Sequence, residues 1–599
     1  MKDVWRIAVA TPRLHLGNPS ANAEEHLAVA CAAAEKGVAV LAFPELSMTG
    51  YTCGDLFFRS DLVQAAESAL ATYACKTRHL PLVSVVGFPE RGSDGLYNAA
   101  AVVAGGEVVG IVRKRTLANY AEYYEKRQFD PAPDEEAPIV FEVGNLRFGI
   151  EICEDLWSPV PPSSRMGGVD VVFNLSASTD FLGKSAARNS LVAQQSLRLG
   201  CAYALSAAGV GESTSDAVYG GGSLIASCGQ ISAEAPLFAE SCLLTADVDV
   251  DALRYRRLSD SSARRSGAGV KPVRQRIACP VVESDPAFVD PAPFLSAYGE
   301  RGWVEKLLSI QAVSLARRMR AARTEKLVIG VSGGADSALA LLGARRAVRR
   351  VGGSLIAVVM PGFASSDRTQ RRAVDLAKTL GVEVRVVDIC ASCRRHLADI
   401  GHDESVHDLV FENVQARERT QILMDVANQE GALVVGTGDL SEIALGWNTY
   451  NGDHMSMYQI NASIPKTMVL AALRDVALGC KGPESALLRE ISEAPITPEL
   501  VPGASEGDSE ARLGPYELHD FFLYHFLANG ASREKLLALA KIAFNGRYDV
   551  TTLERTRDTF WRRFFSAQYK RNCVPDGPKI TLSLSPRADW RMPADAESL

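Results

Sequence analysis

Short runs of apolar residues recur up to about residue 250, and each resembles a buried strand. The runs are WRIAVATP (5–12), VAVLAFPE (38–45), LPLVSVVGF (80–88), LRFGIEIC (146–153), VDVVFNLSAS (169–178) and CAYALSAAG (201–209). Apolar residues at helical spacing lie between some of them, at 22–36 and 184–199. The stretch AAAVVAGGEVVGIVRK (99–114) has Gly-Gly between two apolar runs and predicts a hairpin. Strands and helices mixed in this order predict a layered α/β sandwich.

The second half of the chain follows a regularly alternating pattern. We expect strands at 326–331, 354–360, 382–388 and 432–436, with helices that include 338–350 and 366–380. Such alternation predicts a parallel, doubly wound sheet, in which ligands bind beyond the carboxyl ends of the strands. The expected organisation is a first domain at 1–253, a basic, Gly- and Ser-containing linker at 254–300, and a second domain at 301–599 with a helical insert and a C-terminal tail.

Composition and charge narrow the class of protein. The 599 residues suffice for more than one domain, and the net charge of -7 argues against a general nucleic-acid binder. No apolar stretch is long enough to span a bilayer, and the start has no signal-peptide pattern. Twelve scattered cysteines suit reduced thiols, so we expect a cytoplasmic protein. Cys390 and Cys393 form a lone C-x-x-C without the second pair that zinc sites need, which predicts ordinary thiols.

Three residues with reactive side chains follow predicted strands of the first domain: Glu45, Lys114 and Cys153. Each alone has a plain explanation, since charges at strand ends are usually solvated and a cysteine is usually a small buried hydrophobe. Together they form a chemical set of thiolate nucleophile, carboxylate base and cationic support for an oxyanion. That set suits attack on an amide carbonyl with release of ammonia.

The segments FPELSMTGY, VRKRTLANYAEYYEKRQF and EICEDLW, in this order, resemble the nitrilase-type amidase family over residues 4–250. The resemblance implies an α-β-β-α sandwich with Glu45 as general base, Lys114 as oxyanion support and Cys153 as the nucleophile that forms a thioester. It implies a supporting glutamate at Glu125. Weaker candidates for a glutamine pocket are Tyr51, Tyr120, Trp157, Ser178 and Lys184. Leu117-Ala118 departs from the usual Leu-Pro but removes no reactive group.

In the second domain, VIGVSGGADSALALL (328–342) predicts a strand that runs through a glycine turn into a helix. Glycines let a backbone approach a ligand, and a helix N-terminus favours an anion, so the turn is a candidate phosphate site. It is not a Walker A loop, because no lysine follows the glycines at the required spacing. Ser-Gly-Gly-x-Asp-Ser resembles instead the pyrophosphatase loop of enzymes that adenylate a substrate and release pyrophosphate.

Further segments resemble the NAD⁺ synthetase family over residues 300–595. They are MPGFASSDRT (360–369), ENVQARERT (412–420), the segment 434–467, FFSAQYKRNCVPDGPK (564–579) and SPRADWRMPAD (585–595). The resemblance implies ATP as co-substrate and Mg²⁺ held by Asp336 and Glu442. The implied ATP contacts are Gly330, Val331, Ser332, Gly333, Gly334, Ala335, Asp336, Ser337 and Thr437. The implied deamido-NAD contacts are Asn413, Glu442, Trp447, Asn448, Thr449, Tyr450, Asp453, Lys466, Lys570 and Lys579. Ala588 and a shortened stretch after Lys579 depart from the family and leave the contacts of the tail open.

An ammonia-releasing domain fused to an ammonia-using domain implies a glutamine-dependent ligase. In the implied reaction, deamido-NAD, ATP, glutamine and water give NAD⁺, AMP, diphosphate and glutamate. Because free ammonia would protonate and escape into bulk water, a protected passage between the two sites is part of this hypothesis. The resemblance also implies a homo-oligomer, commonly an octamer.

Two alternatives stay open from the sequence. The pyrophosphatase loop also occurs in ligases that act on GMP precursors, aspartate or tRNA bases, but the segments at 360–369, 412–420 and 434–467 favour deamido-NAD. The first domain could be an inactive interaction module, but its complete set of Glu45, Lys114 and Cys153 favours activity. The expected partners are small molecules, with neither nucleic acid nor membrane.

Overall fold

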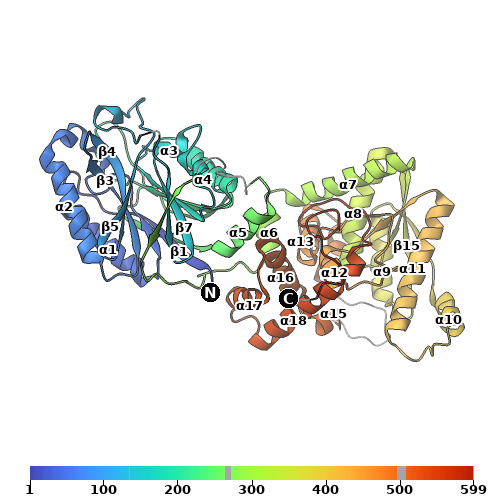
Figure 1. Ribbon diagram of the computed structural model, residues 1–599. Coiled ribbons are helices and arrows are strands. Elements are labelled where there is room, and N and C mark those ends of the chain that lie inside the picture. The colour runs from blue at the N-terminus through green and yellow to red at the C-terminus, as the bar shows by residue number, and fades with distance from the viewer. Residues whose placement is uncertain (134, 263–270, 496–507, 598–599) are drawn as a thin grey trace. The chain divides into compact units, whose positions relative to one another are not determined.

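The computed structural model describes residues 1–133, 135–262, 271–495 and 508–597. The chain forms two compact units, Met1–Ala287 and Phe288–Leu599 (Figure 1). Each unit has its own hydrophobic core. Each unit is described below by itself.

Two sheets packed face to face form the centre of the first unit (Figure 1). Among the described residues, one sheet runs in the order β12 (Cys242–Asp249), β1 (Val4–Thr11), β2 (Val40–Ala42), β3 (Val83–Arg91), β4 (Leu96–Ala104) and β5 (Glu107–Arg113). The other runs in the order β11 (Gln230–Glu234), β10 (Leu224–Ser227), β9 (Ala202–Ala207), β8 (Val171–Ser176), β7 (Leu146–Ile152), β6 (Ile139–Val143) and β13 (Val273–Ile277).

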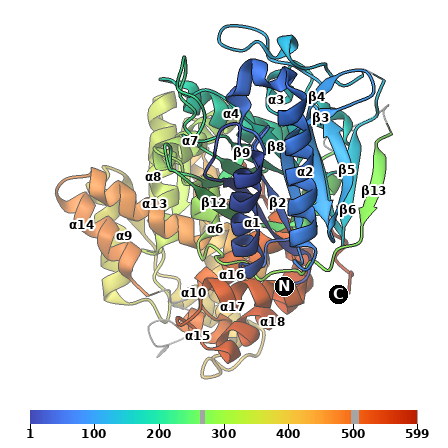
Figure 2. The same cartoon turned by 90° about the vertical axis from the view of Figure 1, so that its left-hand side faces the viewer.

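Helices cover the outer faces of both sheets. In Figure 2, α1 (Pro19–Glu35) and α2 (Ser60–Thr77) lie side by side in front of the β12–β5 sheet, and α4 (Lys184–Leu199) packs on the other sheet. Successive side chains of a strand point to opposite faces of the sheet. Alternate residues therefore pack either between the two sheets or against the covering helices. Ile7 belongs to the core between the sheets, and its neighbour Ala8 packs beneath α1 and α2. The expected α-β-β-α sandwich is confirmed.

The predicted hairpin is formed by β4 and β5, which pair antiparallel. Gly105 and Gly106 connect the two strands, and both have positive φ angles, of 60° and 96°. Tight hairpin turns need such angles, and glycine adopts them without steric cost. The turn therefore sets the register that brings Lys114 to the end of β5.

The stretch expected as a linker is partly regular structure. The helix α5 (Val250–Ser259) reaches into it, and β13 pairs in parallel with β6 at the edge of the second sheet. Up to Ala287 the described residues belong to the first unit. Residues 263–270 of the expected linker lie outside the described residues.

A parallel sheet with helices on both faces forms the centre of the second unit. Its order is β16 (Glu383–Val386), β15 (Ser354–Val359), β14 (Lys326–Gly330), β17 (Leu433–Gly436) and β18 (Tyr458–Gln459) among the described residues. Val328, Ile356 and Val434 pack on the face that α10 (Cys390–Asp399) and α11 (Leu409–Glu430) cover. The opposite face carries α8 (Ala335–Val351) and α9 (Asp367–Thr379). The expected doubly wound fold is confirmed.

Further helices surround this sheet. They are α6 (Pro293–Tyr298), α7 (Trp303–Ala322), α12 (Leu440–Leu445), α13 (Lys466–Gly479), α14 (Pro483–Glu493), α15 (Asp508–Leu513), α16 (Tyr516–Asn529), α17 (Arg533–Ala543), α18 (Val550–Ser566) and α19 (Gln568–Arg571). Helix α16 packs against both α12 and α13. The tail lies beside β18, where Gln459 N donates to Asp576 O at 2.8 Å.

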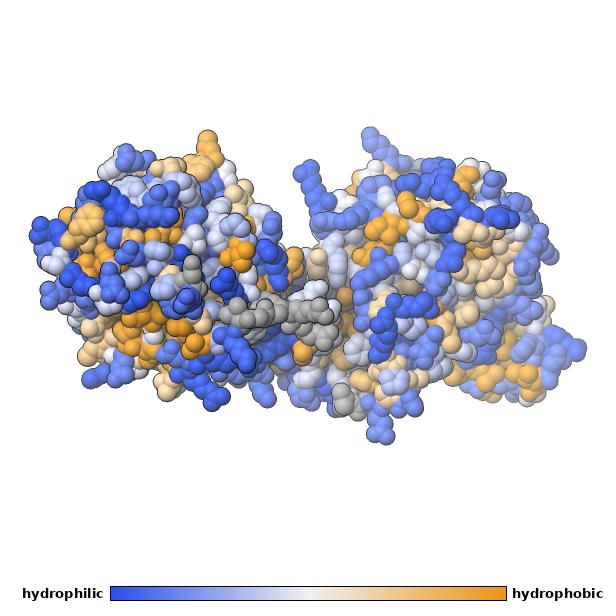
Figure 3. All heavy atoms as spheres, turned by 45° about the horizontal axis from the view of Figure 1, so that its top comes forward, coloured by the Kyte–Doolittle hydropathy of each residue, from blue (hydrophilic) through white to orange (hydrophobic). Residues whose placement is uncertain are grey.

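The surface seen in Figure 3 is mainly polar, with smaller apolar areas on both units. Within the described part of the chain, no helix combines the length and the apolar character needed to cross a bilayer.

Candidate active sites

Loops at three strand ends bring the predicted triad of the first unit together. Glu45 follows β2, Lys114 follows β5 and Cys153 follows β7, and all three side chains are buried. Lys114 Nζ donates to Glu45 Oε1 at 2.6 Å and to Glu125 Oε1 at 2.7 Å. Glu125 lies in the short helix η2 (Glu125–Arg127). One buried ammonium therefore holds both predicted carboxylates.

Two residues that the sequence did not single out complete the surroundings of Glu45. Asn98 Nδ2 donates to Glu45 Oε1 at 2.7 Å, and the backbone N–H of Ala177 donates to Oε2 at 2.8 Å. The carbonyl of Asn98 also accepts the N–H of Lys114 at 2.9 Å. Asn98 thus fixes the base and the lysine together, but a single asparagine in a strand gives no sequence signal for this.

Cys153 occupies a sharp turn between β7 and the short helix α3 (Glu154–Trp157). Its φ is 45° and its ψ is -97°, a region that non-glycine residues rarely adopt. Asp155 stabilises the turn by accepting the N–H of Ile152 at 3.0 Å, and it also accepts the N–H of Thr116 at 2.8 Å. The same carboxylate therefore connects the cysteine turn to the segment after Lys114.

Burial and charge set the protonation states of this site. Burial raises the pKa of Glu45 above its ordinary value, and the attraction of Lys114 offsets only part of that effect. Burial alone would lower the pKa of Lys114, but Glu125 and Glu45 hold it well above its ordinary value. Burial and the charge of Glu45 raise the pKa of the Cys153 thiol, which Lys114 counteracts in part. The resting thiol is therefore protonated, and attack requires a nearby base.

The other predicted residues of this site divide into two groups. Tyr51 contacts the triad region directly, because its hydroxyl donates to Glu125 Oε1 at 2.7 Å, and Ser178 is buried next to Ala177. Tyr120 donates instead to Glu154 Oε2 at 2.9 Å, and Lys184 Nζ lies 4.1 Å from the ring centroid of Trp157. Within the described residues, Tyr120, Trp157 and Lys184 make no hydrogen bond to the triad.

In the second unit, the glycine turn lies between β14 and α8. Ser332 and Ser337 approach each other with their hydroxyls 3.2 Å apart, and Gly334 N donates to Ser332 Oγ at 3.2 Å. Gly333 has a φ of 84°, and a Cβ there would lie 2.4 Å from the carbonyl oxygen of Thr369. The first turn of α9 therefore lies directly against the loop, and only glycine fits at position 333.

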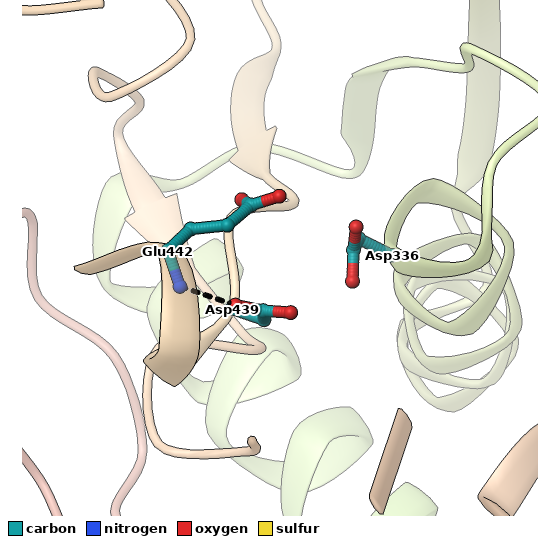
Figure 4. Close-up of side chains that lie close together, drawn as sticks. All are labelled: Asp336, Asp439 and Glu442. Carbon is teal, nitrogen blue, oxygen red and sulfur yellow. Dashed lines mark hydrogen bonds between the residues drawn. The ribbon is translucent and has the colours of Figure 1, made fainter. Parts of the chain in front are cut away.

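Three carboxyl groups converge beside this turn (Figure 4). Asp336 comes from the first turn of α8, Asp439 caps α12, and Glu442 lies in the first turn of α12. One oxygen of each lies within 4.8 Å of the others. Lys466 Nζ lies 2.5 Å from Asp336, 2.9 Å from Asp439 and 3.1 Å from Glu442. The sequence pattern puts Asp439 with Thr437 and Glu442 at the carboxyl edge of the sheet, where ligands bind, but the predicted metal ligands are Asp336 and Glu442.

The electrostatics of this cluster follow from its burial. Burial raises the pKa values of Asp439 and Glu442, and Lys466 offsets that effect only in part. The pKa of Lys466 is nevertheless raised, because the three carboxylates outweigh its own burial. Oxygen donors at this density fit a hard divalent cation such as Mg²⁺. Asp336 Oδ1 is buried without a hydrogen-bond partner among the described residues, which also fits a cation ligand.

Residues of helix α16 help to fix the position of Lys466. Asp520 accepts hydrogen bonds from the Ser441 hydroxyl and from Thr467, whose N–H and hydroxyl lie at 2.9 and 2.7 Å. Ser441 Oγ in turn accepts the N–H of Lys466 at 2.8 Å. One turn earlier on the helix, the Tyr516 ring lies 5.4 Å from Lys466 Nζ. The sequence did not indicate that Asp520 and Tyr516 support Lys466.

Several of the predicted nucleotide contacts belong to two groups of hydrogen-bonded residues near the three carboxylates. Asn461 joins the first, because its Nδ2 donates to the carbonyl oxygens of Asp336 at 2.9 Å and Thr437 at 3.0 Å. In the second, Thr449 Oγ1 donates to Asn413 Oδ1 at 2.8 Å and Thr449 N donates to Asp453 Oδ1 at 2.7 Å.

Most of the remaining predicted contacts lie in the turn after α12 or pack against it. Lys570 Nζ donates to the carbonyls of Gly446 at 2.8 Å and Asn448 at 2.5 Å. The Arg563 guanidinium lies 4.9 Å from the ring centroid of Trp447, and Tyr450 stacks on His454. Lys579 is the exception: it pairs with Asp589 at 2.6 Å, and the described residues show no contact between it and the three carboxylates.

Comparisons with known proteins assign both halves of the chain. The carbon-nitrogen hydrolase family matches residues 6–257, and the NAD synthase family matches residues 308–562. The glutamine-dependent NAD(+) synthetase of Mycobacterium tuberculosis is 36% identical over 650 residues, which cover 98% of this chain and 96% of that protein. The chain belongs to the glutamine-dependent NAD⁺ synthetase family.

A second relative also matches over almost the whole length of the chain. The glutamine-dependent NAD⁺ synthetase of Thermotoga maritima is 30% identical and covers 98% of both chains. A solved structure of the Acinetobacter baumannii glutamine-dependent NAD⁺ synthetase with adenosine diphosphate is 24% identical over 98% of both chains, with a TM-score of 0.38.

Proposed function

We propose that this chain converts deamido-NAD, ATP, glutamine and water into NAD⁺, AMP, diphosphate and glutamate. The observation that carries the proposal is that each half brings a set of reactive side chains together. One half contains Glu45, Lys114 and Cys153, with Lys114 bonded to both Glu45 and Glu125. The other contains a glycine loop beside three carboxylates and a lysine. Full-length likeness to glutamine-dependent NAD⁺ synthetases supports joining the two chemistries.

Amide cleavage begins with attack of the Cys153 sulfur on the carboxamide carbon of glutamine. The thiol proton passes to Glu45, and the carbonyl electrons move to the oxygen. Lys114 uses two of its three N–H groups for Glu45 and Glu125, which leaves one to stabilise the oxyanion. Collapse expels ammonia as Glu45 returns the proton, and water then hydrolyses the thioester. Tyr51, Tyr120, Trp157, Ser178 and Lys184 form the proposed glutamine pocket.

The second unit activates the nicotinate carboxylate of deamido-NAD. The loop Gly330–Ser337 and Thr437 bind ATP. The carboxylate attacks the α-phosphate, the bond between the α- and β-phosphates breaks, and diphosphate leaves as the acyl adenylate forms. Lys466 offsets the negative charge that collects during this step. Asp336 and Glu442 would hold Mg²⁺, with Asp439 beside them, and the bound ion supplies further charge neutralisation. Ammonia then attacks the activated carboxyl carbon, and AMP leaves.

The dinucleotide is held by residues around the turn after α12 and by the tail. These are Asn413, Glu442, Trp447, Asn448, Thr449, Tyr450, Asp453, Lys466, Lys570 and Lys579. We further propose a protected passage for ammonia between the two sites, a homo-oligomer of up to eight chains, and action in the cytoplasm.

One product assay tests the central claim. Purified protein is incubated with ATP, Mg²⁺, deamido-NAD and glutamine, and NAD⁺, AMP and glutamate are measured. We expect all three in equal amounts, and neither AMP nor an amidated product when xanthosine monophosphate replaces deamido-NAD. Cys153→Ala should abolish the use of glutamine but keep synthesis from added ammonia. Glutamine use that survives this change would show that the nucleophile is misassigned.

A further inference from the structure

The end of β8 touches both reactive groups of the amide-cleaving site. Three successive residues take part: the carbonyl of Leu175 accepts the N–H of Cys153 at 2.8 Å, the Ser176 hydroxyl lies 3.5 Å from Cys153 Sγ, and Ala177 N donates to Glu45 Oε2. The Ser176 residue is only 2% exposed. This strand end therefore holds the sulfur and the base in a fixed relation.

The Ser176 hydroxyl donates a hydrogen bond to the sulfur of Cys153. Across the described part of the chain it has no other hydrogen-bond partner, and its distance to Sγ lies within hydrogen-bond range for sulfur. A hydroxyl that donates to sulfur stabilises a thiolate more than a thiol, because the acceptor is then charged. Such a donor matters here, since burial and two neighbouring carboxylates oppose formation of the thiolate, and this hydrogen bond acts in the opposite direction.

The ammonium of Lys114 does not replace this donor. Two of its N–H groups are committed to Glu45 and Glu125, and the remaining one is needed at the substrate oxygen. The sulfur therefore needs a separate hydrogen-bond donor that remains in place while the proton leaves.

We propose that Ser176 is a catalytic residue of the amide-cleaving reaction, whose hydroxyl donates to the sulfur of Cys153 while the thiol proton moves to Glu45. The carbon–sulfur bond then forms with the sulfur electron pair, and the carbonyl π electrons move to the substrate oxygen. When ammonia has left and the thioester has been hydrolysed, the sulfur regains a proton and the hydroxyl still faces it. This assignment rests on the proposed glutamine-cleaving function.

The experiment removes only the hydroxyl. Ser176→Ala is compared with wild type, with Ser176→Thr, which keeps a hydroxyl, and with Ser206→Ala. Ser206 on β9 is an equally buried serine, but its hydroxyl donates to the carbonyl of Ala10 at 2.8 Å and not to sulfur. Full-length proteins are treated with iodoacetamide over a range of pH, and alkylation of Cys153 is followed by mass spectrometry.

For Ser176→Ala we expect alkylation of Cys153 at neutral pH to slow about tenfold and the midpoint of its pH profile to rise by about one unit. The kcat for glutamine hydrolysis should fall by a similar factor with little change in KM. Ammonia-driven NAD⁺ formation and the melting temperature should stay at wild-type values. Ser176→Thr should restore the alkylation profile, and Ser206→Ala should leave it unchanged.

An alkylation profile of Ser176→Ala that superimposes on the wild-type profile would overturn the inference, and so would an equal shift in Ser206→Ala. Failure of the proposed function is distinguishable from either result. In that case wild-type protein itself would release no glutamate, or Cys153→Ala would still cleave glutamine.

Discussion

At the scale of single residues, the two sites share one physical device: a buried lysine held between carboxylates. Lys114 bridges Glu45 and Glu125, and Lys466 lies among three carboxyl groups. In each site, removing the lysine would leave like charges buried together, which is strongly unfavourable. The same burial raises the pKa of the proposed base, and this has a measurable consequence.

The pH dependence of glutamine hydrolysis should reflect Glu45. The carboxylate must be ionised to accept the thiol proton, and burial raises its pKa to about 7. Activity is therefore present above this pKa and lost as the pH falls through it. We expect the acidic limb of kcat/KM for glutamine near neutral pH, well above the range of an exposed glutamate.

Asn98→Ala extends this prediction. The Asn98 amide donates to Glu45 and lowers its pKa, so its loss should move the acidic limb to still higher pH. Ammonia-driven synthesis, measured on the same preparation, serves as the control. A limb that moves to lower pH in this variant would contradict the assignment of Glu45 as the base.

Gly333→Ala should damage the ATP site through its backbone. A Cβ would lie 2.4 Å from the carbonyl oxygen of Thr369, and the φ of 84° is unfavourable for alanine. We expect ammonia-driven NAD⁺ formation to fall at least tenfold while glutamine hydrolysis continues. Gly352→Ala is the matched control, because its φ is 71° but nothing lies within 4 Å of the added carbon. It should cost about 1 kcal/mol of stability and leave synthesis intact.

At the scale of elements, the sequence predicted best those strands whose apolar runs are buried on both faces. The strands β14, β15 and β17 and the helices α8 and α9 lie where the alternating pattern placed them. The strand β13 was not predicted, because VRQRI is polar and its partner β6 lies far away in sequence. Backbone hydrogen bonds at a sheet edge need no apolar side chains, so a basic stretch can form a strand there.

The same contrast holds for the site residues. Glu45, Lys114, Cys153, Asp336 and Glu442 each stand at the end of a predicted strand or in the first turn of a helix, where sequence and chemistry coincide. Asn98, Ser176 and Asp520 act through contacts made only after folding. Asp520 lies more than fifty residues from Thr467, and nothing in its local sequence indicates that contact.

Asp520→Asn tests the supporting role of α16. An amide nitrogen cannot accept the hydrogen bonds that one carboxylate oxygen receives here, so the start of α13 and Lys466 should lose their fixed position. We expect the kcat of ammonia-driven synthesis to fall by about one order of magnitude or more. Glu517→Gln on the same helix is the control, because Glu517 pairs with Arg547 away from Lys466. Equal losses in both variants would mean that the helix as a whole was disturbed.

At the scale of the whole molecule, the chain consists of two units that each enclose a reactive set. The carboxylate cluster belongs to the second unit, and the triad belongs to the first. The two chemistries should therefore respond separately to conditions that affect only one of them.

Removal of divalent cations is such a condition. A chelator should stop ammonia-driven NAD⁺ formation, because Asp336, Asp439 and Glu442 would lose their proposed cation. Glutamine hydrolysis should persist, since the amide-cleaving set consists of sulfur, carboxylates and an ammonium. Added Mg²⁺ should restore synthesis. Synthesis that continues after complete chelation would refute the proposed metal site, and a simultaneous loss of hydrolysis would refute the separation of the two chemistries.

Joining both units in one polypeptide also has a consequence for the cell. Every copy of the chain carries one nitrogen-releasing centre and one nitrogen-consuming centre. Their ratio is therefore always one to one, whereas two separate genes could be expressed at different levels. A change in expression level cannot create a surplus of one over the other. Any mismatch between supply and demand must then be corrected by the turnover rates of the centres themselves.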